Sequence, residues 1–153
     1  MRIDTIPASR NHEWLMTAIS ALLIVLYTYT AFSKLLAFDI FKQQMYNQTL
    51  PKWAAGIIIW TLPGVELVTA FLIFKNRSRL YGYIASSILM TLFTGYVALV
   101  LAGYFGWMPC SCGGVIQSMD WKTHLLFNIF FLLLSLTGIY IINRERRSLG
   151  RKD

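Results

Sequence analysis

Charged residues are scarce in this chain of 153 residues, and acidic residues are the scarcest of them. Only 14% of the residues are charged and 56% are hydrophobic, with 7 aspartates and glutamates against 14 lysines and arginines. A soluble domain usually carries about a quarter charged residues, so the deficit excludes an ordinary soluble fold. The net charge of +7 does not indicate a nucleic-acid partner, because the basic residues lie between and beyond the apolar runs and form no single basic face.

Residues that bind metals or form disulfides are also few. The chain has 2 cysteines and 2 histidines. An iron–sulfur cluster is usually held by four cysteines and is excluded because the chain has only 2. No second cysteine pair is present to complete the usual zinc spacing either. Cys110, Cys112, His124 and Asp120 together leave zinc or copper(I) open as a weaker alternative. We assign no metal.

Four long apolar runs occupy most of the chain instead. They span about 14–36, 53–74, 80–105 and 121–143. At a rise of ~1.5 Å per residue, each is long enough to cross a hydrocarbon core of ~30 Å. The first run is too long for the apolar core of a cleaved signal peptide, which spans about 7–15 residues. We therefore predict an all-α fold, an integral membrane four-helix bundle in which residues 1–153 form a single membrane domain.

Three features are expected to depart from four simple membrane-spanning helices. Residues 37–52 carry Phe38, Phe41 and Met45 at roughly helical spacing, which predicts a short amphipathic helix at the membrane interface. Pro63 in the second run predicts a bend and a carbonyl without its helical partner. The third run is longer than one crossing needs, so it is expected to tilt or to project toward the cysteines.

The distribution of lysine and arginine predicts the orientation. The N-terminus, the 75–79 link and the C-terminus together carry ten of these residues, whereas the opposite side carries Lys34, Lys42, Lys52 and Lys122. The positive-inside rule then places both termini in the cytoplasm and the loop between the third and fourth runs outside. Both cysteines lie in that loop and are expected to face an oxidising compartment.

The cysteines lie in the segment Pro109–Gly114, which reads Pro-Cys-Ser-Cys-Gly-Gly. A disulfide closing so small a ring stabilises by only ~1.6 kcal/mol, against ~3 kcal/mol for a loop of about 15 residues. The close spacing also forces a strained bridge, and strained, exposed bridges are the more oxidising and labile ones. The pair is therefore predicted to be redox-active, with a plain structural bridge as the alternative.

Glu66 is the only acidic residue deep in an apolar run. A charged carboxylate there costs at least ~2.5 kcal/mol, so Glu66 should be protonated, paired or in a wet cavity. Two roles remain open at this point. Glu66 either handles protons or forms a structural hydrogen bond across helices, with Thr91, Thr94 or Ser135 as the expected partner.

Other polar residues also have two interpretations each. His124, one turn before Asn128, either lowers a thiol pKa and passes protons or simply lies at the interface. Lys34 either extends to the outer surface, or it polarises a quinone carbonyl or stabilises a thiolate. The tyrosines of the first and third runs are more typical of packing residues, although Tyr29 is also a candidate for the neighbourhood of a quinone.

Three segments resemble a known family. Tyr29–Leu36, with Phe41 downstream, is similar to the first-helix signature of the MauE/DoxX superfamily, and Leu62–Leu67 resembles its second-helix Pro-x-x-Glu pattern. Pro109–Gly114 resembles the cysteine-bearing loop of the MauE branch, together with the residues that follow it, Trp121, His124 and Asn128. The resemblance covers about residues 14–143.

This resemblance implies a four-helix integral membrane bundle with Cys110 and Cys112 as its redox pair, while Lys34 and Glu66 match family positions. MauE members are associated with the maturation of methylamine dehydrogenase, with a periplasmic thioredoxin-like partner and with disulfide formation. DoxX relatives are linked to quinone-coupled sulfur oxidation. Nothing in the sequence itself points to methylamine.

The leading hypothesis is a thiol–disulfide redox protein of the bacterial inner membrane, with its cysteine loop facing the periplasm. Cys110 and Cys112, assisted by His124, would exchange with a periplasmic thioredoxin-fold protein and support the maturation of periplasmic proteins. Electrons would pass to or from the membrane pool through a quinone, for which the candidate binding residues are Lys34, Tyr29, Glu66 and Asn128. The alternatives are a non-enzymatic membrane anchor or assembly subunit with a structural disulfide, and a metal-handling membrane protein.

Overall fold

The computed structural model describes residues 10–106 and 120–149, and every regular element in these two ranges is a helix. The helices are α1 (Arg10–Leu36), α2 (Phe38–Tyr46), α3 (Lys52–Phe74), α4 (Arg79–Leu101) and α5 (Trp121–Leu149). Four of them, α1, α3, α4 and α5, are long and apolar enough to cross a membrane. The predicted all-α class and the four membrane-span candidates are confirmed.

Two predicted ends differ from the observed ones. α4 ends at Leu101, before the predicted residue 105, because Gly103 and Gly106 follow with φ of 71° and 72°. Glycine adopts this left-handed conformation readily, and it ends a helix. α5 continues beyond residue 143 to Leu149 through an arginine-rich stretch, because arginine is a good helix former and its charge is favourable near a helix C-terminus.

The linker between the first two spans contains α2, as predicted. Phe41 and Met45 on one face of α2 are buried against α3 residues Ala55 and Ile59, whereas Lys42 is exposed. α3 itself continues through Pro63 as one helix from Lys52 to Phe74. The proline therefore does not divide the second span.

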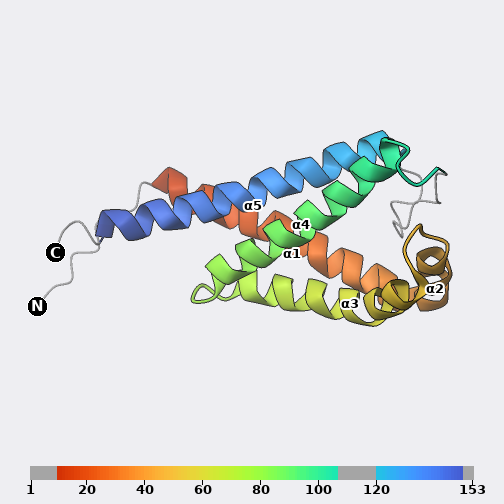
Figure 1. Ribbon diagram of the computed structural model, residues 1–153. Coiled ribbons are helices and arrows are strands. Elements are labelled where there is room, and N and C mark those ends of the chain that lie inside the picture. Colours follow the sequence, from red (N-terminus) through yellow and green to blue (C-terminus); the bar gives the residue numbers. More distant parts are fainter. Residues whose placement is uncertain (1–9, 107–119, 150–153) are drawn as a thin grey trace, which may run out of the picture.

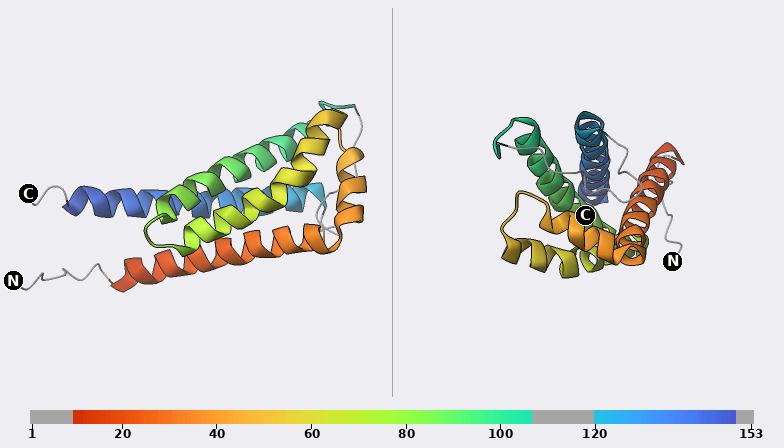
Figure 2. Two further views of the ribbon diagram at one scale, coloured as in Figure 1. Left: turned by 90° about the horizontal axis from the view of Figure 1, so that it is seen from below. Right: turned by 90° about the vertical axis from the view of Figure 1, so that its right-hand side faces the viewer.

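The helices pack mainly in two pairs, α1 with α3 and α4 with α5. α3 and α4 meet at the short turn of residues 75–78 and diverge toward the other end of the bundle, where α2 crosses (Figure 1 and Figure 2). α1 begins and α5 ends at the same end of the bundle (Figure 1). The assignment of that end to the cytoplasm stays a prediction from the charges.

The centre of the bundle combines apolar packing with buried hydroxyl groups. Leu23 and Tyr27 of α1, Ile73 of α3 and Tyr83 of α4 are almost completely buried in one apolar cluster. The Tyr27 hydroxyl donates to Ser86 Oγ at 2.9 Å, and the hydroxyls of Ser86 and Ser135 lie 2.6 Å apart. These bonds tie α1, α4 and α5 together where the polar groups are shielded from solvent.

Candidate functional site

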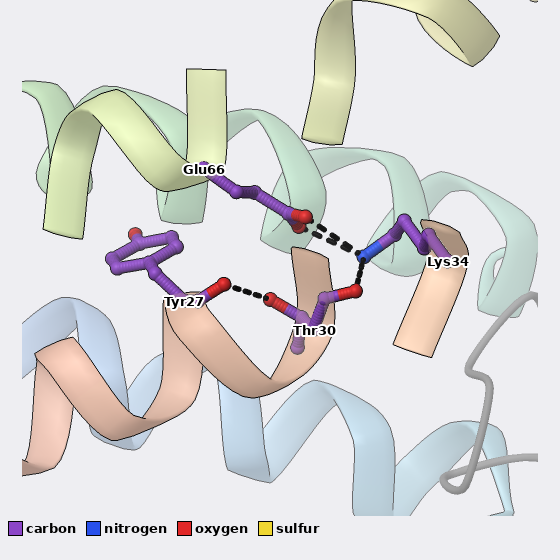
Figure 3. Close-up of polar contacts among 4 residues, drawn as sticks. All are labelled: Tyr27, Thr30, Lys34 and Glu66. Carbon is purple, nitrogen blue, oxygen red and sulfur yellow. Dashed lines mark hydrogen bonds and ion pairs between the residues drawn. The ribbon is translucent and has the colours of Figure 1, made fainter. Parts of the chain in front are cut away.

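A buried ion pair connects α1 and α3. Lys34 Nζ lies 2.8 and 3.1 Å from the two carboxylate oxygens of Glu66 and also donates to the Thr30 carbonyl at 3.2 Å (Figure 3). The side chains of Lys34 and Glu66 are 13% and 3% exposed. A lysine and a carboxylate in such contact neutralise each other, which is how two charges are tolerated inside a membrane bundle.

This pair corrects two of the predicted interpretations. Lys34 does not extend to the outer surface, because its ammonium group is turned inward to Glu66. The structural partner expected for Glu66 was also wrong: Ser135 bonds to Ser86, and Thr91 donates to the carbonyl of its own helix at Ser87. Of the states expected for Glu66, the paired one is observed.

The periodicity of α1 explains which of its polar residues reach the site. Tyr27, Thr30 and Lys34 follow one another at spacings of three and four residues and therefore share one face of the helix; Figure 3 shows all three on the side of α3. Thr30 also donates its hydroxyl to the Tyr27 carbonyl at 3.2 Å. Tyr29 lies about 200° around the helix from Tyr27. Its side chain is 42% exposed and does not line the cavity described next.

A cavity of about 500 Å³ lies beside the ion pair, and all five helices contribute to its lining. Most of the lining is apolar, from side chains such as Leu62, Met90 and Phe93. The polar groups include Lys34 and Glu66. A largely apolar cavity of this size with a few converging polar groups has the character of a small-molecule binding site.

The first two turns of α5 supply further polar residues to the lining of the cavity. Trp121, His124 and Asn128 all line the cavity, because spacings of three and four place them on one face of the helix. Asn128 is 4% exposed, and its side-chain nitrogen has no hydrogen-bond partner within residues 10–106 and 120–149. Four predicted site residues, Lys34, Glu66, His124 and Asn128, thus share one cavity.

Sequence reasoning missed the contribution of the α2–α3 connection. Tyr96 of α4 donates its hydroxyl to Gln48 Oε1 at 2.7 Å and lies 3.1 Å from the Thr49 hydroxyl. Both Tyr96 and Gln48 line the cavity. The sequence predicts Tyr96 only as a packing residue, because no local pattern signals a bond between side chains so far apart along the chain.

The predicted redox segment Pro109–Gly114, with Cys110 and Cys112, lies outside the described residues. Its flanks, at Gly106 and Asp120, belong to the described part, and α5 begins at Trp121 directly in the cavity wall. Within residues 10–106 and 120–149, no three His, Asp or Glu side chains gather as a metal site requires. The alternative metal set includes both cysteines and is therefore not tested.

Together, the four candidate spans, the buried ion pair and the cavity define a multi-pass helical membrane protein with a largely apolar internal cavity. The sequence model of one family, described as Methylamine utilisation protein MauE, matches residues 12–141. Because this match covers most of the chain, the protein belongs to the MauE family. No curated protein and no solved structure matches the chain significantly.

Proposed function

We propose that this protein is a thiol–disulfide redox protein of the bacterial inner membrane that couples Cys110 and Cys112 to a quinone. The observation that carries the proposal is the cavity beside Lys34 and Glu66, whose wall includes His124 and Asn128. An apolar site with a small polar region suits a quinone, which has a polar ring and an apolar tail.

The position of the cysteines along the chain supports the same coupling. They lie in the segment between α4 and α5, and α5 lines the cavity from its first residue, Trp121. Both flanks of this segment lie at the end of the bundle that α2 crosses (Figure 1). Because the chain has only 2 cysteines, no second pair can relay electrons. The pair must therefore react with the quinone directly.

The proposed cycle has two balanced steps. In the first, the thiols of Cys110 and Cys112 lose two electrons and two protons to the quinone, which becomes the quinol as the S–S bond forms. In the second, a thiolate of a periplasmic thioredoxin-fold partner attacks this disulfide and forms a mixed disulfide. The partner's second thiol resolves it, so that the partner leaves oxidised and both cysteines return to thiols.

The site residues have distinct roles in this proposal. His124, which lines the cavity on the helix that follows the cysteines, accepts and passes protons between the dithiol and the quinone. Lys34 and Glu66 hold a neutral but strongly polar pair beside the quinone ring. A disulfide supplied to the partner in this way supports the maturation of periplasmic proteins.

The experiment is a single-turnover reaction between the reduced protein in lipid nanodiscs and a soluble quinone analogue. We expect one quinol and one disulfide to form for each protein, measured by quinone absorbance and by thiol alkylation. Cys110→Ser and Cys112→Ser should each abolish both products, whereas Cys110→Ala/Cys112→Ala should still retain the helical fold by circular dichroism.

Two results would count against this function. A reduction potential of the pair below about −300 mV would make the bridge structural in practice. Capture of the thioredoxin-fold partner by the doubly substituted protein, with no quinone reduction by the native one, would identify a non-enzymatic anchor instead.

A further inference from the structure

The exposed part of the cavity lining lies on α3 and α4. Three lining residues are exposed: Thr61 and Val65 on α3, and Leu92 on α4. Val65 is 44% and Leu92 65% exposed. α3 and α4 diverge from their common turn toward the end of the bundle that α2 crosses (Figure 1). We call Thr61, Val65 and Leu92 the side opening.

The side opening lies in two membrane-span candidates, Lys52–Phe74 and Arg79–Leu101. Val65 is the fourteenth residue of α3 and Leu92 the fourteenth of α4, so both lie well inside their spans. Exposed apolar side chains at that depth face acyl chains rather than water. The cavity is therefore accessible from the bilayer interior.

The end of the cavity next to α2 is covered. Phe41 and Met45 of α2 line the cavity and are buried, at 4% and 7% exposure. The hydrogen bonds of Tyr96 to Gln48 and Thr49 tie α4 to the α2–α3 connection. In the described part of the chain, the exposed residues of the lining therefore concentrate on the side that faces lipid.

Inside the cavity, one buried polar group is unpaired. The side-chain nitrogen of Asn128 has no hydrogen-bond partner among the residues that the structure describes, whereas Lys34 and Glu66 satisfy each other. A buried donor without an acceptor is unfavourable, and a ligand that supplies an acceptor removes this cost. The ligand headgroup should therefore carry a hydrogen-bond acceptor such as a carbonyl oxygen.

We propose that the cavity takes up a long-tailed carbonyl lipid sideways from the bilayer, through the side opening, and holds its headgroup by a hydrogen bond from Asn128. This inference rests on the proposed function insofar as the lipid is a quinone. The volume of about 500 Å³ accommodates a headgroup and the start of a tail. The remainder of the tail extends between Val65 and Leu92 into the membrane.

The experiment uses the protein with Cys110→Ser and Cys112→Ser in nanodiscs, so that no thiol reaction contributes. A photoreactive azidoquinone with a decyl tail is the probe, and its tail-free counterpart is the comparison. We expect adducts of the tailed probe on the cavity faces of α3, α4 and α5, mapped by mass spectrometry.

Bulky substitutions test the side opening. Val65→Trp and Leu92→Trp should slow labelling by the tailed probe severalfold and affect the tail-free probe less. Ile57→Trp on α3 and Ile88→Trp on α4 are the matched controls, because both residues are 57% exposed and neither lines the cavity. Equal rates in the opening variants and the controls would overturn the sideways route.

A second pair of variants tests the headgroup contact. Asn128→Leu should weaken binding of the tailed probe about tenfold, as expected for the loss of one hydrogen bond to a buried acceptor. Thr94→Val is the matched control, since the Thr94 hydroxyl is also buried without a partner but Thr94 does not line the cavity. Unchanged affinity in Asn128→Leu, or adducts that avoid the first turns of α5 in the protein with native Asn128, would overturn this contact.

These outcomes separate this inference from the proposed function. Tailed-probe binding that depends on Asn128 and on the side opening, without dithiol oxidation by the native protein, would overturn the redox function and leave the lipid site standing. If quinone oxidises the dithiol, but probe binding depends neither on Asn128 nor on the side opening, the lipid site alone would be overturned.

Discussion

At the level of single residues, Lys34 and Glu66 stabilise each other's charge inside the bundle. Either charge alone would be expensive in an apolar surrounding, whereas the pair is neutral and each carboxylate oxygen has a bond from the ammonium group. The requirement for a partner followed from Glu66 alone. The identity of the partner did not, because Lys34 lies 32 residues away in the chain.

Removing one member of this pair should destabilise the protein strongly. Lys34→Met leaves the Glu66 carboxylate buried without its partner, so we expect the free energy of unfolding to fall by about 3–5 kcal/mol. Lys34→Met/Glu66→Leu should recover much of this loss, because neither charge then remains. Reversible unfolding in mixed detergent micelles measures both.

Lys42→Met is the control for this prediction, because Lys42 is exposed on α2. Its effect should stay within about 0.5 kcal/mol. A loss in Lys34→Met no larger than in the control would show that the ion pair does not stabilise the native bundle.

At the level of elements, close contacts at small residues set how α4 lies against α5. A Cβ atom at Gly138 of α5 would come within 2.7 Å of the Tyr83 ring of α4. The Tyr83 ring is held in turn by its hydroxyl, which lies 2.8 Å from Ser20 Oγ on α1. Because α5 carries His124 and Asn128, this packing also determines how α5 presents them to the cavity.

Gly138→Ala should therefore loosen the α4–α5 pair. We expect a loss of about 1–3 kcal/mol in the free energy of unfolding, since the ring of a fully buried tyrosine must move to make room. Gly95→Ala on α4 is the matched control, because a Cβ there meets nothing within 4 Å. That control should be neutral or more stable by up to about 1 kcal/mol. Equal stability of the two variants would contradict the close contact.

At the level of the whole molecule, the four candidate spans bring the start of α1 and the end of α5 to one end of the bundle. The turn between α3 and α4 lies toward that same end, and α2, the end of α4 and the start of α5 lie at the other (Figure 1). The excess of lysine and arginine at the first end predicts that it is cytoplasmic.

Single-cysteine labelling in the Cys110→Ser/Cys112→Ser background tests this orientation. Lys122→Cys should react with a membrane-impermeant maleimide in intact spheroplasts, whereas Arg77→Cys should react only after permeabilisation. Both native residues are exposed, so access does not depend on burial within the bundle. The reverse labelling pattern would place the cysteine segment in the cytoplasm and remove the basis for a periplasmic partner.

Much of this arrangement follows from local sequence. The four spans and the amphipathic α2 depend on composition, length and helical spacing, which neighbouring residues alone decide. The same spacing could have excluded Tyr29 from the cavity, because it faces away from Tyr27, Thr30 and Lys34. The end of α4 could likewise have been placed earlier, since Gly103 follows it directly.

The sequence by itself therefore determined the class of protein, its helices and the need of Glu66 for a partner, since each depends on short-range chemistry. Only the tertiary structure decided that Lys34 is that partner, that Asn128 and His124 share a cavity with the ion pair, and that the exposed residues of its lining lie on α3 and α4. Those features depend on how the helices are rotated and spaced against one another. Contacts such as that of Gly138 with Tyr83 control this rotation and spacing, and they join residues far apart in the chain.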